Sequence, residues 1–233
     1  MSASPASNVR WHDCADAPTL ARRACDWIAD AAARAIAARG RFDLVLAGGN
    51  TPRAAYEALR AAQTDWSRWR IWFGDERCAQ VDDPQRNSVM ARAALLDHVP
   101  ISPSNIHVIA GERGAQDAAA DYSVALREVG AFDLVVLGLG EDGHTASLFP
   151  GHDWGDGNDA PPALPVFAAP KPPPQRVSLS AARLSRAREV LFLVEGQGKR
   201  DALARWRAGV AIPAAAIHPI NGVDVLVAPP MSL

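Results

Sequence analysis

The chain has 233 residues, enough for one large α/β domain or two small ones, and 48% of them are hydrophobic, which is typical of a globular protein. Its formal net charge of −2, with acidic and basic residues interspersed, predicts binding neither to nucleic acid nor to a membrane surface. Three widely spaced cysteines without a C-x-x-C pair fit a reducing compartment and predict neither a disulfide framework nor a zinc site. The first residues do not read as a secretory signal, and no apolar run reaches the roughly 20 residues that span a bilayer, so we expect a cytoplasmic protein.

Helical and strand patterns alternate along the whole chain. The first helix is predicted over 20–36, with Gly40 as its C-terminal stop, and a short apolar strand follows at 42–47. Further helices are predicted at 52–62, 87–99, 116–129, 182–188 and 199–208, and strands at 70–73, 106–109, 132–137, 165–169, 177–179, 190–194 and 223–228. Apolar strands that alternate with helices predict a largely parallel sheet covered on both faces, in one domain over residues 1–233.

The first candidate site follows the strand 42–47. Ligands of open parallel sheets bind beyond the carboxyl ends of the strands, and here the chain reads Gly48-Gly49-Asn50-Thr51-Pro52. The glycines let backbone amides approach an anion, Thr51 can cap the next helix, and Pro52 suits its first turn. This predicts a helix N-terminus that holds a phosphate, the alternative being a tight turn without a ligand. It is not a Walker loop, because no Lys-Ser/Thr pair follows.

The second candidate site follows the strand 70–73, where the chain reads Gly74-Asp75-Glu76-Arg77. Three charged side chains directly after an apolar strand are seldom buried without a role. We expect Asp75 to help orient a hydroxylated substrate and Arg77 to supply positive charge. The alternative is an exposed polar turn with an internal Arg/Glu pair.

The third candidate site lies after the strand 132–137, in the sequence GLGEDGHTASLFPG. The G-x-G-x-x-G pattern is not followed by the long helix of a dinucleotide-binding fold, because Pro150 comes soon after Gly143. His144, beside Asp142, is instead placed for proton transfer near neutral pH, the alternative being a structural histidine that caps the turn. Ligand spacings typical of zinc are absent, so we predict no metal and no cofactor.

Two basic residues complete the list of candidates. Arg176 opens a strand after a proline cluster, and Lys199 begins a helix after a Gly-x-Gly turn. A cation at a helix N-terminus is unfavourable for the helix dipole, which argues for a bound anion beside Lys199. The alternative for each is a surface cation that covers apolar neighbours.

Five blocks of the chain resemble, in order, those of the glucosamine-6-phosphate isomerase/6-phosphogluconolactonase family. They are LAGGNTPRAAYEAL, WFGDER with Asn87 ten residues beyond Arg77, LGLGEDGHTASLFPGH, PKPPPQRVSLS and GQGKRDAL. The related glucosamine-6-phosphate deaminases typically carry Ile-Ala-Phe-Asn after the histidine, where this chain has residues 145–149 as TASLF. That difference favours the lactonase branch. Departures from the lactonase pattern at Ala79-Gln80 and Arg86 leave the contacts of this loop open, including the role of Asn87.

The resemblance implies a three-layer α/β/α, modified Rossmann-like fold. It also implies metal-free hydrolysis of 6-phospho-D-glucono-1,5-lactone to 6-phospho-D-gluconate in the oxidative pentose phosphate pathway. His144 would be the general base and Arg77 the active-site arginine, with Asp142 as a candidate to orient the imidazole. The residues matching the sugar-phosphate contacts are Gly48, Gly49, Asn50, Thr51, Arg176 and Lys199. Two alternatives remain open, an aminosugar-phosphate isomerase/deaminase and a non-catalytic sugar-phosphate sensor, and the sequence leaves the oligomeric state and activity on unphosphorylated lactones undetermined.

Overall fold

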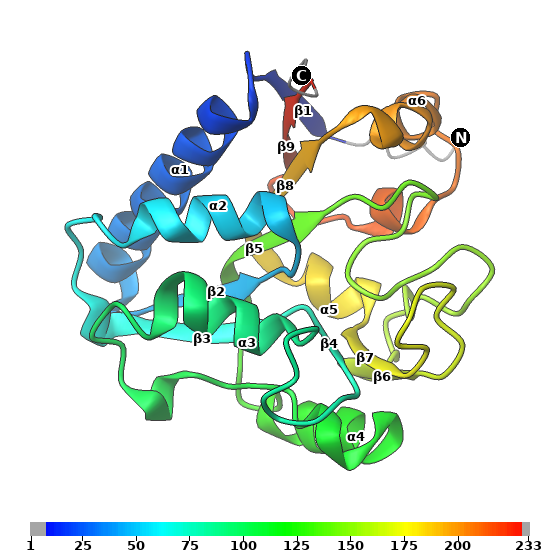
Figure 1. The fold of residues 1–233 in the computed structure, drawn as a ribbon, viewed down its shortest axis with the longest axis horizontal. Helices are drawn as coiled ribbons and strands as arrows, with labels where there is room; N and C mark the ends of the chain where they lie inside the picture. Colours follow the sequence, from blue (N-terminus) through cyan, green and yellow to red (C-terminus); the bar gives the residue numbers. More distant parts are fainter. Residues whose placement is uncertain (1–7, 230–233) are drawn as a thin grey trace.

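The computed structural model describes residues 8–229 and contains two sheets (Figure 1). The larger one has the strand order β1-β9-β8-β5-β2-β3, and all its neighbouring pairs are parallel. Its strands are β1 (Val9–Asp13), β2 (Phe42–Leu46), β3 (Trp69–Phe73), β5 (Phe132–Gly138), β8 (Ala187–Glu195) and β9 (Val223–Ala228). The smaller, antiparallel sheet has the order β4-β7-β6, from β4 (Asp75–Arg77), β6 (Ala163–Val166) and β7 (Arg176–Leu179).

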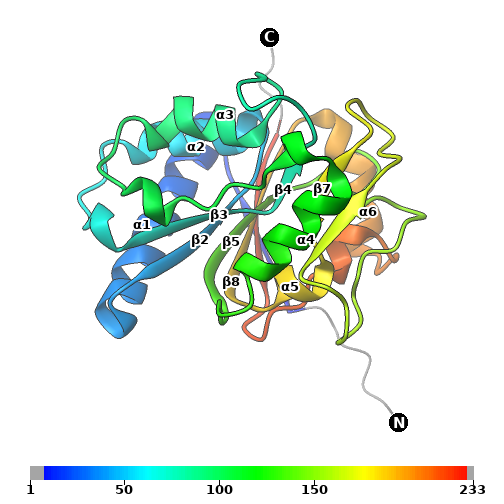
Figure 2. The same ribbon diagram turned by 90° about the horizontal axis from the view of Figure 1, so that it is seen from below.

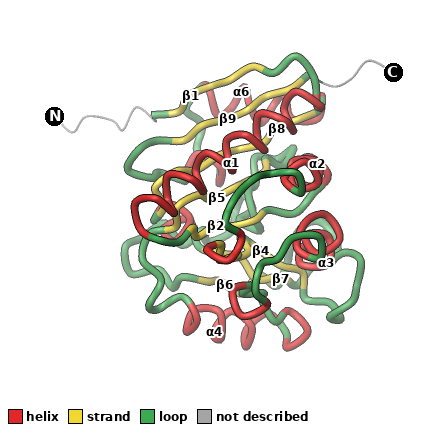
Figure 3. The backbone as a smooth tube through the Cα atoms, turned by 90° about the vertical axis from the view of Figure 1, so that its left-hand side faces the viewer, coloured by secondary structure: helices red, strands yellow, loops and turns green. Residues whose placement is uncertain are grey.

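Helices cover both faces of the larger sheet, which gives three layers (Figure 2). On one face lie α1 (Ala17–Arg39), α2 (Asn50–Leu59) and α3 (Asn87–Ala91), and Figure 3 looks onto this face with the strands behind α1. On the other lie α4 (Ala115–Ala125), α5 (Ala181–Ser185), α6 (Arg200–Arg207) and the small sheet. The predicted fold class is therefore confirmed. Among residues 8–229, every helix is too short or too polar to span a lipid bilayer.

Several predicted elements differ in the structure. The strand predicted at 106–109 is absent, because only Ile106 pairs with the sheet, through one bridge to Ile71, before the chain turns away. The helix predicted at 87–99 is α3 followed by a π-helical stretch over Arg92–Leu96. Strand β6 ends at Val166, earlier than the predicted 165–169, and the next residue, Phe167, is 57% exposed. Neither β1 nor the antiparallel pairing of the small sheet was predicted.

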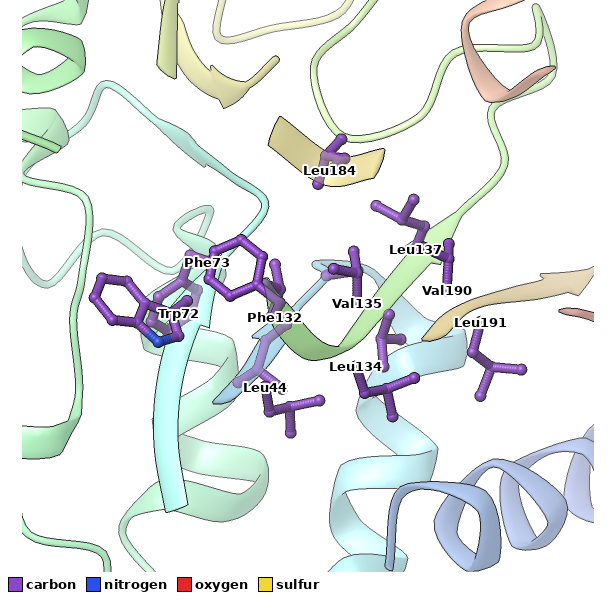
Figure 4. Packing of buried hydrophobic residues seen from close by; sticks show 14 of the residues in the cluster. Leu44, Trp72, Phe73, Phe132, Leu134, Val135, Leu137, Leu184, Val190 and Leu191 are labelled. Atoms are coloured by element: carbon purple, nitrogen blue, oxygen red, sulfur yellow. The ribbon is translucent and has the colours of Figure 1, made fainter. Parts of the chain in front are cut away.

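Apolar side chains of the central strands form the core between the layers (Figure 4). Leu44 of β2 and Leu134 of β5 are fully buried and lie opposite one another in register. Trp72 of β3 packs against Phe132, with ring centroids 6.0 Å apart. Helix α1 ends as predicted at Gly40, whose positive φ of 72° lets its N–H reach the carbonyl of Ile36 at 2.8 Å.

Ion pairs occupy the amino ends of the same strands. Asp43 of β2 accepts two 2.7 Å hydrogen bonds from Arg70, and Asp224 of β9 accepts bonds of 2.8 and 2.6 Å from Arg10. Both carboxylates are nearly inaccessible, at 2% and 4% exposed. Two-pronged arginine contacts of this kind neutralise the acids at the amino ends of these strands.

Candidate active site

A cavity of about 420 Å³ opens at the carboxyl ends of the parallel strands. Residues that follow four different strands line it: Gly48 and Gly49 after β2, Asp75 and Arg77 after β3, Gly140 and His144 after β5, and Lys199 after β8. Arg176 of β7 and Lys171 of the preceding loop complete its basic wall. The structure thus brings together most of the candidate residues, although they lie far apart in the sequence.

His144 is oriented by a carboxylate two residues earlier. Its Nδ1 lies 2.5 Å from Oδ1 of Asp142, and the same oxygen accepts the backbone N–H of His144 at 3.1 Å. An ionised carboxylate can only accept, so we assign the proton to Nδ1, which leaves Nε2 with a free lone pair. The phenyl ring of Phe149 packs against the imidazole, with centroids 4.7 Å apart.

Protonation of this pair follows from burial and charge. Burial lowers the pKa of His144 below its ordinary value, Asp142 and Asp75 oppose that shift, and Lys171 adds to it. Burial by itself would raise the pKa of Asp142, but hydrogen bonds with His144 and its charge lower that pKa below its usual range. At neutral pH the pair is therefore a neutral imidazole beside a carboxylate, the state a general base requires.

The glycine-rich turn makes room for the histidine. A Cβ built on Gly140 would lie 2.0 Å from Nδ1 of His144, so only glycine fits there without displacing the ring. Ala146, two residues beyond the histidine, has φ 48° and is the one non-glycine residue with a positive φ among residues 8–229. A left-handed alanine costs on the order of 1 kcal/mol or more, and such strain concentrates at functional sites.

The two arginines of the cavity are adjacent across the small sheet, where Arg77 pairs in register with Arg176. Arg176 is 4% exposed, its Nε and Nη2 donate to backbone carbonyls of residues 171–173, and its Cζ lies 5.6 Å from the ring centroid of Phe149. Burial lowers its pKa, with Asp75 opposing and Arg77 adding. Arg77 donates from Nη1 to the carbonyl of Gln85 at 2.6 Å, while its buried Nε has no partner within the described residues.

Two lysines line the cavity, and only Lys199 was predicted from the sequence. Lys199 is the N-cap of α6. Burial lowers its pKa, while the charges of Glu141 and Asp142 oppose that shift. Lys171 lies 3.6 Å from Glu141, both side chains being exposed. Lys171 was visible in the PKPPP block but carried no signal of its own, because nothing in the local pattern shows that this loop folds back over the cavity.

The first turn of α2 matches the prediction only in part. Gly48 and Gly49 line the cavity, and Gly49 is the N-cap with φ 103° and no side-chain cap. Thr51 is therefore not the cap, and its hydroxyl instead donates to Glu195 at 3.1 Å. Asn50 is exposed, and neither its side chain nor that of Thr51 lines the cavity. What this turn offers to an anion is the backbone N–H groups at the start of α2.

The charged turn after β3 is built around a buried carboxylate. Glu76 is fully buried and accepts the backbone N–H groups of residues 77, 87 and 88 at 2.7–2.9 Å. Arg86, also buried, lies 3.5 Å from Glu76 and 2.7 Å from Glu112. The family departure at Arg86 is therefore an internal ion pair that braces the loop. Asn87, whose role the sequence left open, lines the cavity and donates from Nδ2 to Asp75 at 2.8 Å.

In the part of the chain that the structure describes, no three His, Cys, Asp or Glu side chains are grouped so as to hold a metal ion. His144 lines the same cavity as four cationic side chains, which suits an anionic ligand. The residues present offer a base, an orienting carboxylate and positive charge within one cavity.

Comparisons with known proteins agree with this geometry. Residues 15–226 match the family model of glucosamine-6-phosphate isomerases/6-phosphogluconolactonase. The chain is 39% identical to a 6-phosphogluconolactonase of Synechocystis sp. (83% of each chain covered), and 38% identical to that of Rattus norvegicus (79% of this chain, 76% of the relative). The crystal structure of 6-phosphogluconolactonase from Thermotoga maritima superposes with a TM-score of 0.87 at 26% identity, over 94% of this chain and 99% of that one. These relatives confirm the predicted enzyme class, that of lactone hydrolases, and the chain belongs to the glucosamine-6-phosphate isomerase/6-phosphogluconolactonase family.

Proposed function

We propose that this enzyme hydrolyses 6-phospho-D-glucono-1,5-lactone to 6-phospho-D-gluconate, in the oxidative pentose phosphate pathway of the cytoplasm, as one domain without metal or cofactor. One observation carries the proposal: a half-buried imidazole oriented by a carboxylate shares its cavity with four cationic side chains. A phosphorylated lactone matches both features, since it joins an electrophilic carbonyl to a phosphate. Relatives that are similar over most of this chain are named for the same reaction.

The phosphate binds, in this proposal, to Arg176 and Lys199 together with the backbone amides at the start of α2. The cavity is lined by Arg176, Lys199 and Gly49, the N-cap of α2. A guanidinium, an ammonium and the N–H groups of a helix N-terminus all bind anions. Fixing the phosphate holds the carbonyl carbon near His144. Such positioning converts the attack of water into an effectively unimolecular step and can contribute several kcal/mol, about 7 or more in well-oriented cases.

His144 then acts as the general base. Its Nε2 takes a proton from water as the oxygen attacks the carbonyl carbon, and Asp142 stabilises the imidazolium that forms. When the tetrahedral intermediate collapses, the bond from the carbon to the ring oxygen breaks and Nε2 returns the proton to that oxygen. Acid–base work of this kind contributes about 10²–10⁴-fold.

Arg77 is the group proposed to stabilise the developing oxyanion. Arg77 lines the cavity, and its Nη1 donates a hydrogen bond to the backbone carbonyl of Gln85. This bond fixes the orientation of the guanidinium plane. Only Nη1 of this guanidinium has a hydrogen-bond partner among the described residues, so Nη2 remains available to donate to an oxyanion in the cavity. Removing one preorganised oxyanion donor lowers kcat by about 10²–10³-fold in related reactions.

The test is a lactonase assay with substrate generated in situ and corrected for spontaneous hydrolysis. We expect His144→Ala to lose turnover while binding of 6-phosphogluconate survives. Equal loss of turnover and binding would make His144 a structural or binding residue. Wild-type protein that releases ammonia from glucosamine 6-phosphate and leaves the lactone at its spontaneous rate would refute the lactonase in favour of the deaminase. Binding of sugar phosphates with neither reaction would identify a sensor.

A further inference from the structure

The carboxylate of Asp75 is buried and already engaged by the protein. Asp75 begins β4 and is 6% exposed. Its Oδ2 accepts a 2.6 Å hydrogen bond from the hydroxyl of Ser147, and its Oδ1 accepts one of 2.8 Å from Nδ2 of Asn87. Ser147 and Asn87 are themselves only 2% and 4% exposed. Each oxygen of the carboxylate therefore already accepts one hydrogen bond from a buried side chain of the protein.

Asn87 cannot swing away from this arrangement. Its Nδ2 also donates to the backbone carbonyl of Asp75 at 2.9 Å, and its N–H donates to Glu76 at 2.7 Å. On the other side, a Cβ built on Gly48 would lie 1.9 Å from Oδ1 of Asn87. The carboxamide is thus wedged between β4 and the turn that follows β2, and it holds the Asp75 side chain in place.

Ser147 belongs to the loop that carries His144. Between them lies Ala146, whose positive φ persists only if the chain is fixed on both sides. On the near side, the hydroxyl of Thr145 donates to the carbonyl of Gly138 at 2.9 Å. On the far side, Ser147 is held by its hydroxyl on Asp75 and by its N–H, which donates to the hydroxyl of Ser178 at 3.2 Å.

We propose that Asp75 is a positioning residue for the lactonase reaction: through Ser147 it holds the His144 loop in its working geometry, and it does not bind substrate. The reaction rests on the proposed function above, whereas the anchor is a property of the chain alone. This role is an alternative to the substrate contact predicted from the sequence. The charge of Asp75 has a separate effect, because it raises the pKa of His144 together with Asp142, while burial and Lys171 lower it.

The first test compares Ser147→Ala with Ser180→Ala. Ser180 is equally buried and caps α5 outside the cavity, so it controls for the loss of a buried hydroxyl. We expect Ser147→Ala to lower kcat by up to about 100-fold, since a misplacement of about 1 Å can cost that much. KM should change by less than about threefold, because the phosphate anchors are untouched. Ser180→Ala should keep the wild-type kcat.

Two further readouts need no substrate. Backbone amides of residues 144–148 should exchange with solvent faster in Ser147→Ala than in the wild type, and at the wild-type rate in Ser180→Ala. An NMR titration of His144 should give a lower pKa in Asp75→Asn, which removes the charge. If Ser147→Ala does not fold, amide exchange and the His144 titration are both measured on Asp75→Asn, which conserves the side-chain volume.

The proposal fails if Ser147→Ala keeps wild-type kcat and amide exchange, because the loop would then be held by other contacts. It fails as well if KM rises many-fold with kcat unchanged, since Ser147 and Asp75 would then belong to substrate binding. A wild-type protein that hydrolyses no lactone refutes the proposed function alone, and exchange and titration still decide the anchor.

Discussion

Replacing Gly140 by alanine should disable the histidine without touching a charged group. The added Cβ would lie 2.0 Å from Nδ1 of His144, whereas ordinary contact begins at 3.4 Å, so the ring must retreat by about 1.4 Å. The first bond to be lost is the 2.5 Å contact of Nδ1 with Asp142. A shift of about 1 Å in a catalytic group can cost 10²-fold, or about 2.7 kcal/mol of transition-state stabilisation.

The assay measures kcat and KM for the lactone together with binding of 6-phosphogluconate. Kcat should fall by about 100-fold while product binding stays within about threefold, because the cations of the cavity do not move. Gly130→Ala is the matched control: its Cβ meets nothing within 4 Å and its φ is not positive. Both variants are compared well below their melting temperatures, since overpacking at residue 140 can cost about 1–3 kcal/mol of stability.

Two results would refute this reasoning. If Gly140→Ala keeps kcat within threefold of the wild type, the position of the imidazole in the structure does not control turnover. If product binding falls as far as kcat, the substitution has collapsed the cavity and has not displaced one ring. A loss shared by Gly130→Ala would show a general cost of removing glycine.

Three other substitutions or conditions test separate parts of the molecule. Lys199→Ala should raise KM by about 10- to 100-fold, because a hydrogen bond to a charged group is worth about 1.5–3 kcal/mol. A large loss of kcat with unchanged KM would exclude a role of Lys199 in anchoring the phosphate. Arg86→Ala should lower the free energy of unfolding by about 3 kcal/mol in a urea titration, because fully buried Glu76 loses its counter-ion, and a change under 1 kcal/mol would show that the backbone amides suffice. Burial lowers the pKa of His144 below its ordinary value of 6.5, so kcat/KM measured against pH should begin to fall only below pH 6.5. If kcat/KM reached half its maximum above pH 6.5, the pKa of His144 would not be lowered as the structure indicates. The unfolded chain binds this proton first, so His144 should also cost stability as pH falls below about 6.5.

Periodicity predicted the parallel sheet because its strands are apolar on both faces and short enough to separate from helices. The same signal was wrong at 106–109, where one bridge at Ile106 replaces a strand. Of the apolar residues in this stretch only Ile109 is buried, and Val108 is 39% exposed. A short apolar run does not by itself show whether its backbone pairs with a sheet. Strands were predicted at 165–169 and 177–179, but their antiparallel pairing into a second sheet was missed. Its third strand, β4, is three residues long and resembles a charged turn.

The candidate site could be predicted to the extent that its residues directly follow strands. His144, Arg77 and Lys199 satisfy that rule and line one cavity. Asn87 and Lys171 do not, because one starts a helix and the other lies in a proline-rich loop, and only tertiary folding brings them to the cavity. No local pattern encodes such a contact.

In the proposed mechanism a base and a phosphate site share one cavity, and charge makes the two compatible. Burial and the charge of Lys171 lower the pKa of His144 and so favour the neutral imidazole, while Asp142 and Asp75 oppose them. Asp142 also binds Nδ1, which directs Nε2 away from the carboxylate. When a phosphate dianion neutralises part of the basic wall, the pKa of His144 should rise. The acid-side fall of kcat should therefore occur at a higher pH than that of kcat/KM, because kcat reports the substrate complex and kcat/KM the free enzyme. In the proposed mechanism, substrate binding therefore strengthens the base at the moment when it is needed.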